Sequence, residues 1–323
     1  MFKKLLISTL LATVGLSANA ATLRFATNTS NDIVSGHLIQ EFADRVREDT
    51  DNRVRVRIFW NGSLGSQQEY LQQIQTGIVD FGLVGSATLE NIEPSIGVLN
   101  MPFLFDTVED YGKVMNSEYM RDEMYHSTTQ HGFTSIGYIS NGFRSLISTK
   151  PISSLDDMSS LKIRSMDSRS FIDSLNTMGV SPIPMNFGDV YPGMQQGIID
   201  GADLGLSSFW DLKYGEIANY GIRTEHVRLT DFIVMSERVK SKISEADLAT
   251  IKDIMFDVSD KSLALVEEDQ RQSVEKAIEN YNVEIIDVDK AELASRFNTF
   301  YARVAENPAT KDAYNTITSI LEK

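Results

Sequence analysis

Two arginines stand twenty residues apart in stretches that otherwise carry little charge, and both could bind an anion. Arg144 closes the sequence NGFR, and Arg164 closes the sequence LKIR. An arginine keeps its charge at any accessible pH, and its planar guanidinium fits a carboxylate through two parallel hydrogen bonds. A protein that buries such a group usually supplies an anion to meet it. The pattern therefore predicts a binding site for an organic anion.

The chain contains no residue pattern typical of an enzyme. It has no cysteine, which excludes thiolate nucleophiles, cysteine metal sites and disulfides. No Gly-x-Ser-x-Gly, Gly-x-Gly-x-x-Gly or Walker sequence occurs, so neither a hydrolase nucleophile nor a phosphate-binding loop is indicated. The histidines lie far apart without zinc-site spacing: His37, His126, His131 and His226. We expect no catalytic residue, no metal site and no cofactor.

The first twenty residues have the pattern of a secretory signal peptide. Lys3 and Lys4 precede an apolar run over residues 5–16, and residues 18–20 (ANA) form a small-x-small cleavage sequence. A membrane anchor is the weaker interpretation, because the run is shorter than the roughly 20 residues that span a bilayer. We expect cleavage before Ala21 and a periplasmic location.

The composition is acidic, with 45 acidic and 30 basic residues and a formal charge of −15. Residues 1–20 contain two lysines and no acid, so their removal gives −17 over 303 residues. Nucleic acid and anionic membranes need a basic surface, which argues against both as partners. A bound anion therefore requires a local basic pocket, since charges farther away are screened within about 8 Å. A chain of this length is expected to form two domains.

The N-terminal half alternates between strand and helix patterns. Residues 22–27 are typical of a strand, and apolar residues at positions 38, 42 and 46 predict the buried stripe of a helix. Residues 53–58 alternate strictly, as a strand with one covered face does. Residues 78–84 predict an interior parallel strand. This alternation predicts an α/β fold.

One phrase occurs twice, 120 residues apart. QTGIVD at residues 75–80 and QQGIID at residues 195–200 each fit a helix that ends at a left-handed glycine and continues into a buried strand. The repeat suggests two domains of similar build, although chance similarity of so short a phrase stays open.

A helix much longer than average is predicted in the C-terminal third. Residues 244–247 (SEAD) resemble a capping box, and Leu248, Ile251, Met255 and Val258 follow as an apolar stripe. No proline or glycine occurs up to residue 280, and a break near residues 259–260 is possible. A helix of this length could tie two domains together.

In chain order, several short sequences together resemble one family. They are LRFA at 23–26, LG at 64–65 followed by QQE at 67–69, GIVDF at 77–81, MPFLF at 101–105, and the block from residue 141 to residue 203 that contains both arginines. Their order over nearly the whole mature chain resembles the extracytoplasmic solute-binding proteins of tripartite ATP-independent periplasmic (TRAP) transporters, the family of the dicarboxylate and sialic acid receptors.

The resemblance implies an α/β periplasmic binding protein of two domains, joined by crossing strands and a long helix, that closes on a ligand in the cleft. Domain I is then expected at residues 21–141 and 230–269, and domain II at 142–229 and 270–323. By the same resemblance Arg164 would pair with the ligand carboxylate. Arg144 would be the second cleft arginine, with an ion pair that supports the hinge as the equally open alternative.

Further cleft positions follow from the resemblance and from the expected elements. They are Asn28 after the first strand, Gln68 and Glu69 at the start of the next helix, Ser86 at the carboxyl end of the third strand, and Asn186. Each of these residues has a plain alternative as a cap or turn residue.

The chain departs from the family pattern after Gly201. The acid-sugar receptors usually place an asparagine at the position of Leu204, which puts a sialic acid or uronate ligand in doubt. Beside the arginines, Asp167 or Asp203 could meet a positive group, and Phe209 or Trp210 could stack on a flat or cationic ligand. Packing in the core is the alternative for both aromatics.

We therefore expect a non-catalytic, monomeric periplasmic receptor that passes a small organic anion to membrane permease subunits. An aldonate, keto acid or dicarboxylate is the first expectation for the ligand, and a zwitterion of the ectoine or amino-acid type is the second. The rivals are a secreted hydrolase with a carboxylate pair and the binding protein of an ATP-driven importer.

Overall fold

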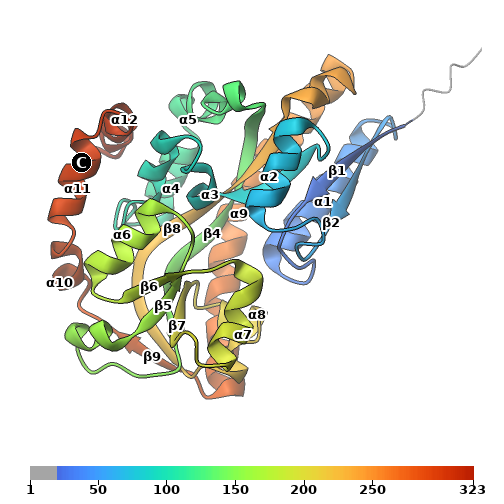
Figure 1. Ribbon diagram of the computed structural model, residues 1–323. Coiled ribbons are helices and arrows are strands. Elements are labelled where there is room, and N and C mark those ends of the chain that lie inside the picture. Colours follow the sequence, from blue (N-terminus) through green and yellow to red (C-terminus); the bar gives the residue numbers. More distant parts are fainter. Residues whose placement is uncertain (1–19) are drawn as a thin grey trace, which may run out of the picture.

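The computed structural model describes residues 20–323. The predicted signal peptide therefore lies, apart from its last residue, outside the described residues. One mixed sheet runs through this part of the chain in the order β2-β1-β3-β8-β4-β7-β5-β6, and β9 pairs with β8. Helices pack around it, which confirms the predicted α/β class (Figure 1).

The strands are β1 (Ala21–Ala26), β2 (Val54–Phe59), β3 (Phe81–Gly85), β4 (Phe133–Ser148), β5 (Lys162–Ser165), β6 (Ser181–Pro184), β7 (Gly201–Leu204), β8 (Tyr220–Ser236) and β9 (Glu284–Asp287).

The α-helices are α1 (Val34–Asp49), α2 (Gln67–Thr76), α3 (Ser86–Leu89), α4 (Val108–Met115), α5 (Glu118–Asp122), α6 (Arg169–Met178), α7 (Val190–Gln195), α8 (Ser208–Asp211), α9 (Glu245–Tyr281), α10 (Lys290–Ser295), α11 (Asn298–Glu306) and α12 (Lys311–Leu321). Short 3₁₀ turns lie between them, among them η1 (Pro94–Asn100).

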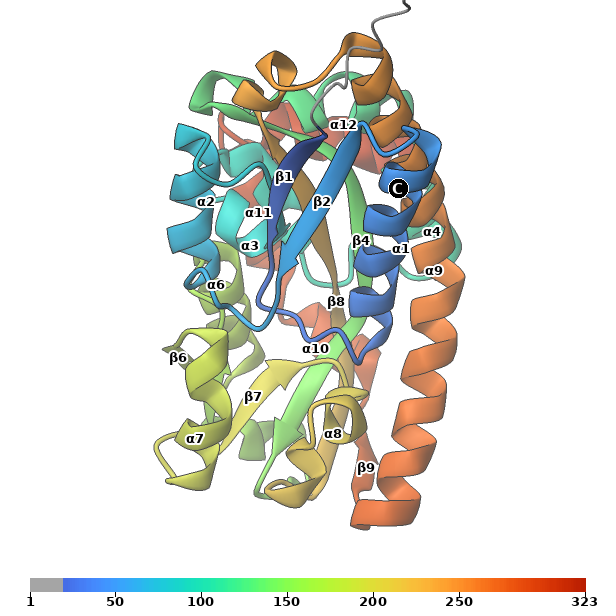
Figure 2. The ribbon, with the colours of Figure 1, turned by 90° about the vertical axis from the view of Figure 1, so that its right-hand side faces the viewer.

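Two long antiparallel strands, β4 and β8, divide the molecule into two lobes. One end of this pair joins β3, β1 and β2, which with α1–α5 we call lobe I. The other end joins β7, β5, β6 and β9, which with α6–α8 we call lobe II (Figure 2). The predicted domain boundaries at residues 141/142 and 229/230 thus fall inside these two strands, and the domain division itself stays a prediction.

The repeated phrase forms the same turn in both lobes. Gly77 ends α2 with φ 76°, and Gly197 follows α7 with φ 72°. In lobe I the carboxylate of Asp80 accepts the backbone N–H of Arg24, and in lobe II that of Asp200 accepts the N–H of Lys162. The third strand of lobe I begins only at Phe81, because Ile78 lies in the exposed turn, so the predicted strand at 78–84 started too early.

The long helix α9 extends over 37 residues and contacts both lobes. It begins at Ser244, whose side chain accepts the N–H of Asp247, as the capping pattern predicted. The suggested break near residue 259 is wrong. Instead, the Ser259 and Ser262 hydroxyls accept the N–H groups of Tyr138 and Ser140, and so attach the unbroken helix to β4.

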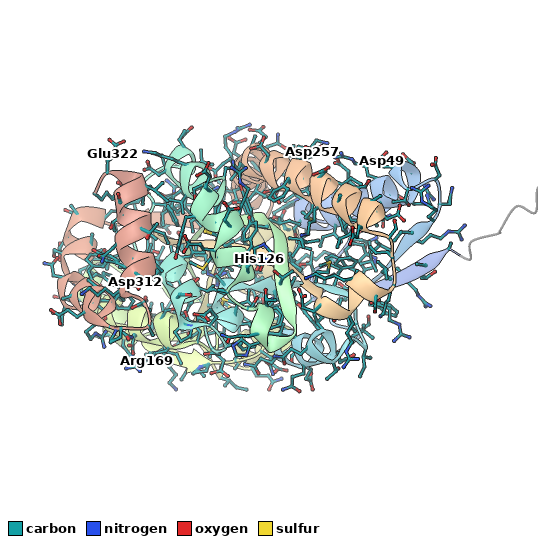
Figure 3. All side chains as sticks on the ribbon, turned by 90° about the horizontal axis from the view of Figure 1, so that it is seen from above. Asp49, His126, Arg169, Asp257, Asp312 and Glu322 are labelled. Carbon is teal, nitrogen blue, oxygen red and sulfur yellow. The ribbon has the colours of Figure 1, made fainter. Side chains whose placement is uncertain are left out.

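The C-terminal helices α10–α12 lie along the side of the molecule opposite α1 (Figure 1). The last helix, α12, packs on α4 and η1 of lobe I, although the sequence placed residues 270–323 with the second domain. Seen from above, charged side chains such as Asp257, Asp312 and Glu322 point outward (Figure 3).

The point where β4 passes from one lobe to the other depends on a glycine. Gly142 lies in a register irregularity of β4 with φ +68°, and a Cβ there would stand 2.3 Å from Gln270 Cδ. The Gln270 amide accepts the N–H of Phe143 and donates to the carbonyls of Asn141 and Phe143. A side chain at position 142 would break this link between α9 and the crossing strand.

We expect Gly142→Ala to lower the free energy of unfolding by about 2–4 kcal/mol, from a strained backbone and lost hydrogen bonds. Urea unfolding measures this change. Gly197→Ala is the matched control, because Gly197 has a similar φ of +72° with nothing within 4 Å of an added Cβ. Equal destabilisation of the two variants would show that the link to Gln270 contributes nothing.

Candidate ligand-binding site

A pocket of about 560 Å³ lies between the lobes, within the size range of small-molecule sites. Lobe I contributes the segments after β1 and β2 and the start of α2, and lobe II contributes the segments after β5, β6 and β7. The crossing strands β4 and β8 form the floor, and α9 closes one side. Polar and charged residues of the lining include Asn28, Gln68, Glu69, Asn141, Arg144, Arg164, Asp167, Asn186, Asp211, Asp231 and Asp269.

Arg164 is a buried cation without an acidic partner. It stands on β5, only 5 % exposed, and its Nε donates to the Met185 carbonyl at 3.0 Å. Neither Nη1 nor Nη2 makes a hydrogen bond, and no carboxylate forms a salt bridge with it, within the part of the chain that the structure describes. Burial, with the nearby charge of Arg144, lowers the pKa of Arg164 to about 10, so the group remains cationic at neutral pH. Its two terminal nitrogens can receive a carboxylate.

Arg144 is a buried cation that does have an acidic partner. Its Nε lies 2.7 Å from Asp203 Oδ1, and Nη2 donates to the Asp203 carbonyl. Burial alone would raise the pKa of Asp203, but Arg144 and the neighbouring His226 hold it below its usual value. The pair gives Arg144 a supporting role at the base of the pocket, while its Nη1 has no partner among residues 20–323. The arginines thus differ, and the cluster of two cations and one anion keeps a net positive charge.

Asp231 is a pocket residue that the sequence did not single out. It stands on β8, 6 % exposed, and accepts a hydrogen bond from Asn141 Nδ2 at 2.6 Å. Burial raises the pKa of Asp231 to about 6, although the Asn141 hydrogen bond and the Arg144 charge oppose this shift. A signal was present, since Asp231 is an acid directly before the apolar run 232–235 in a strand that crosses the molecule.

Seven predicted cleft residues line the pocket: Asn28, Gln68, Glu69, Arg144, Arg164, Asp167 and Asn186. Leu204 also belongs to the lining and adds an apolar side chain to it. Glu69 is also engaged in a capping box with Ser66, in which its Oε2 accepts the Ser66 N–H at 2.7 Å. Gln68 Nε2 donates across the cleft to Asp167 Oδ2 at 3.3 Å. Whether these residues touch the ligand stays a prediction.

Four other predicted residues lie outside the lining. The Ser86 hydroxyl is buried and donates to Asn100 Oδ1, and Asp203 is fully buried against Arg144. Phe209 is completely buried in the core of lobe II. Trp210 is half-buried against Tyr281 and Lys276. The two aromatics pack in and against the core, so the expectation that they stack on a ligand is corrected.

The lobes are also joined by a second set of contacts, between the segment that follows α3 and the residues around the start of α6. Glu90 of lobe I accepts the Ser170 N–H at 2.9 Å, in the first turn of α6 in lobe II. Its other oxygen accepts from the Ser170 hydroxyl and from Asn100 Nδ2. Asn91 Nδ2 donates to the Asp167 carbonyl at 2.9 Å. Glu90 thus places an acid at the N-terminus of α6, where the helix dipole favours a negative charge.

Among residues 20–323, no group of three or more histidine and acidic side chains is arranged to hold a metal ion. A separate search of the same residues finds no helix with the length and apolarity needed to cross a bilayer.

The buried pair of Arg144 and Asp203 gives the first test of the site. We expect Arg144→Met to lower the free energy of unfolding by about 3–5 kcal/mol, because it leaves the Asp203 carboxylate buried without a cation. Urea unfolding measures the loss. The double variant Arg144→Met with Asp203→Asn should be more stable than Arg144→Met alone, since the stranded charge is gone. A wild-type urea midpoint for Arg144→Met would rule out this supporting role.

The raised pKa of Asp231 predicts a pH dependence of stability. Between pH 4 and 6 the folded protein keeps a proton that the unfolded chain loses, so stability falls as pH rises through this window, by about 3 kcal/mol in total. Asp231→Asn should remove this decrease in the free energy of unfolding, because the asparagine does not titrate. Urea unfolding at pH 4.5 and pH 7 measures the difference, with the exposed Asp167→Asn as control. The same pH slope in Asp231→Asn and wild type would contradict the shift.

Comparisons with known proteins give the family. The model of the bacterial extracellular solute-binding proteins, family 7, matches residues 25–307. The chain is 28 % identical to the uncharacterised protein YiiZ of Salmonella typhimurium, over 98 % of this chain and 97 % of that protein. It is 25 % identical to the 2,3-diketo-L-gulonate-binding periplasmic protein YiaO of Escherichia coli, over 85 % of this chain and 84 % of the relative.

Solved structures of TRAP periplasmic solute-binding proteins have a fold similar to that of this chain. A TRAP periplasmic solute-binding protein from Chromohalobacter salexigens with bound D-glucuronate is 27 % identical, with a TM-score of 0.87 over 92 % of this chain and 99 % of that chain. One from Xanthobacter autotrophicus with bound β-D-galacturonate is 26 % identical, with a TM-score of 0.86 over the same shares. The protein therefore belongs to family 7 of the bacterial extracellular solute-binding proteins, the TRAP receptors that its sequence resembles.

Proposed function

We propose that this receptor captures a small organic acid between its lobes and that Arg164 binds the carboxylate of the ligand. The observation that carries the proposal is the contrast between the two arginines. Arg144 already faces Asp203, whereas Arg164 lines the pocket with two terminal nitrogens that have no partner among the described residues. A buried unpaired charge is unfavourable. A ligand that neutralises the charge of Arg164 removes this penalty, which makes the free energy of binding more favourable.

The chemistry of known relatives supports the same class of ligand. The two solved relatives above hold uronates, and the name of the Escherichia coli relative is that of a receptor for a keto sugar acid. Each of these compounds carries one carboxylate on a hydroxylated or oxidised chain. Leu204 lines the pocket where an asparagine was expected for acid sugars, so this chain replaces one polar contact by an apolar wall. Uronates and aldonates therefore both belong among the candidate ligands.

A zwitterion receptor is the less favoured alternative. Stacking on an aromatic was one of the two features that would have indicated it, and Phe209 is completely buried while Trp210 lies outside the pocket lining. Acidic groups do line the pocket, so an amine on the ligand would still find a partner. The two ligand classes are separated by direct binding measurements.

The receptor is proposed to work by closing and reopening without chemistry on the ligand. The contacts of Glu90 and Asp167 across the cleft favour the closed arrangement, and the β4 and β8 strands provide the hinge. We further propose that a cleaved signal peptide brings the chain to the periplasm, that the receptor acts as a monomer, and that it passes its ligand to membrane permease subunits.

We expect Arg164→Met to weaken binding of organic acids by at least tenfold, because a charge-assisted hydrogen bond contributes about 1.5–3 kcal/mol. Isothermal titration calorimetry with D-glucuronate, D-galacturonate and L-gulonate measures the affinities. Arg169→Met is the matched control, since the side chain of Arg169 is 88 % exposed on α6.

A thermal-shift screen of the wild-type protein tests the same proposal more broadly. A ligand at 100 times its dissociation constant should stabilise the fold by about 2.7 kcal/mol. If only neutral sugars raised the melting temperature, or if Arg164→Met bound the acids as tightly as wild type, the proposed function would be overturned.

A further inference from the structure

The floor of the pocket contains a second charged group of opposite sign to Arg164. Asp231 lies on β8 among the lining residues, and its side chain is more than nine-tenths buried. One carboxylate oxygen, Oδ2, accepts the hydrogen bond from Asn141. The other, Oδ1, makes no hydrogen bond with any residue from 20 to 323. A carboxylate oxygen that has no donor, on a buried residue in the wall of a pocket, is a place for a donor on the ligand.

The position of this carboxylate is fixed by the crossing strands. Asp231 pairs with Gly85 of β3 on one side and with Ile139 of β4 on the other. At position 85 an added Cβ would stand 3.2 Å from Asp231 Oδ1, so the missing side chain of Gly85 leaves the space in front of this oxygen open. Asn141, from the hinge region of β4, holds the opposite oxygen. The group is therefore oriented before any ligand arrives.

Arg164 and Asp231 form two separate poles of one pocket. Asp203 and Arg144 influence the pKa of Arg164, whereas Asn141 and Arg144 influence that of Asp231. Arg144 is the charged group whose effect reaches both of them. The terminal nitrogens of Arg164 can donate hydrogen bonds to one part of a ligand. The oxygen Oδ1 of Asp231 can accept a hydrogen bond from another part.

We propose that Asp231 is the specificity-determining residue of this receptor: it accepts a hydrogen bond from a hydroxyl group of the ligand and repels a second carboxylate, so that hydroxylated monocarboxylates bind and dicarboxylates do not. This inference rests on the proposed carboxylate site at Arg164. With its pKa at about 6, Asp231 is mostly ionised at pH 8, the condition in which acceptance and repulsion are both strongest.

A hydroxyl fits this pole better than an ammonium group. Arg144 is close enough to lower the pKa of Asp231, so a cationic donor would also meet the positive charge of Arg144. A hydroxyl makes the same hydrogen bond without that repulsion. The other acids of the lining are more exposed than Asp231: Asp167 is exposed, and Asp211 and Asp269 are intermediate. Their charges are more strongly screened, and they contribute less to the choice of ligand.

The test is the ratio of two affinities in one protein and its variant. Isothermal titration calorimetry at pH 8 is carried out with D-glucuronate, which has one carboxylate and several hydroxyls, and with succinate, which has two carboxylates and no hydroxyl. We expect wild type to prefer D-glucuronate by at least 100-fold. Asp231→Asn keeps the shape of the side chain and removes the charge, so the preference should fall by at least tenfold, through weaker binding of D-glucuronate and tighter binding of succinate.

Asp49→Asn provides the matched control, because it makes the same change of charge at an exposed position of α1 outside the pocket lining, and its preference should stay within threefold of wild type. An ectoine titration separates the two donors: tight binding of ectoine by wild type that is lost in Asp231→Asn would replace the hydroxyl by an ammonium group and overturn the proposal. An unchanged preference in folded Asp231→Asn would overturn it as well.

The same measurements separate an error in the role of Asp231 from an error in the carboxylate site at Arg164. If wild type bound neither acid, or if Arg164→Met left the binding of D-glucuronate intact, the carboxylate site itself would be wrong. If Arg164→Met abolished binding while Asp231→Asn kept the wild-type preference, the carboxylate site would stand and only the role of Asp231 would fall. Urea unfolding of each variant at pH 8 establishes that the proteins compared are folded.

Discussion

The feature on which this receptor depends is the buried positive charge of Arg164, which no acidic residue among residues 20–323 neutralises through a salt bridge. Two guanidinium groups are buried at the base of the cleft, and of these two only that of Arg144 forms a salt bridge within residues 20–323, with Asp203. Because Asp203 pairs with Arg144, the charge of Arg164 is left facing the pocket. Water is a poor substitute at a site so thoroughly buried, and the proximity of Arg144 makes the excess charge more unfavourable. A carboxylate ligand would compensate the charge of Arg164. The proposed preference for organic acids therefore follows from an uncompensated positive charge in the empty cleft.

The rest of the fold holds these charges on different strands of the sheet. Arg144 stands on β4 and Asp231 on β8, the strands that belong to both lobes, whereas Arg164 stands on β5 of lobe II alone. The serines of α9 attach the long helix to β4, and Gln270 holds the irregular turn at Gly142. Glu90 reaches the N-terminal turn of α6. The proposed closure would therefore bring a group fixed in one lobe toward groups fixed on the crossing strands.

The sequence predicted the elements with strong periodicity and missed features that arise only from packing. The strand patterns at 22–27 and 53–58, the helical stripe after Leu38 and the glycine turns all have the expected form, because local chemistry decides them. The pairing of Arg144 with Asp203 joins residues 59 positions apart, and no spacing rule indicates it. Ser259 resembled a helix break, yet its hydroxyl binds β4. Phe209 and Trp210 resembled stacking residues, yet they belong to the packing of lobe II.

Asp231 was overlooked for a related reason: an acid in a strand acquires meaning only when the strand is seen to form the floor of a pocket. The family relation places the protein among receptors without fixing the orientation of its ligand. A crystal structure of the protein with bound D-glucuronate would test the central claim most directly. We expect the ligand carboxylate to lie within hydrogen-bond distance of Nη1 and Nη2 of Arg164. A carboxylate bound elsewhere in the cleft, with Arg164 facing only water, would contradict it.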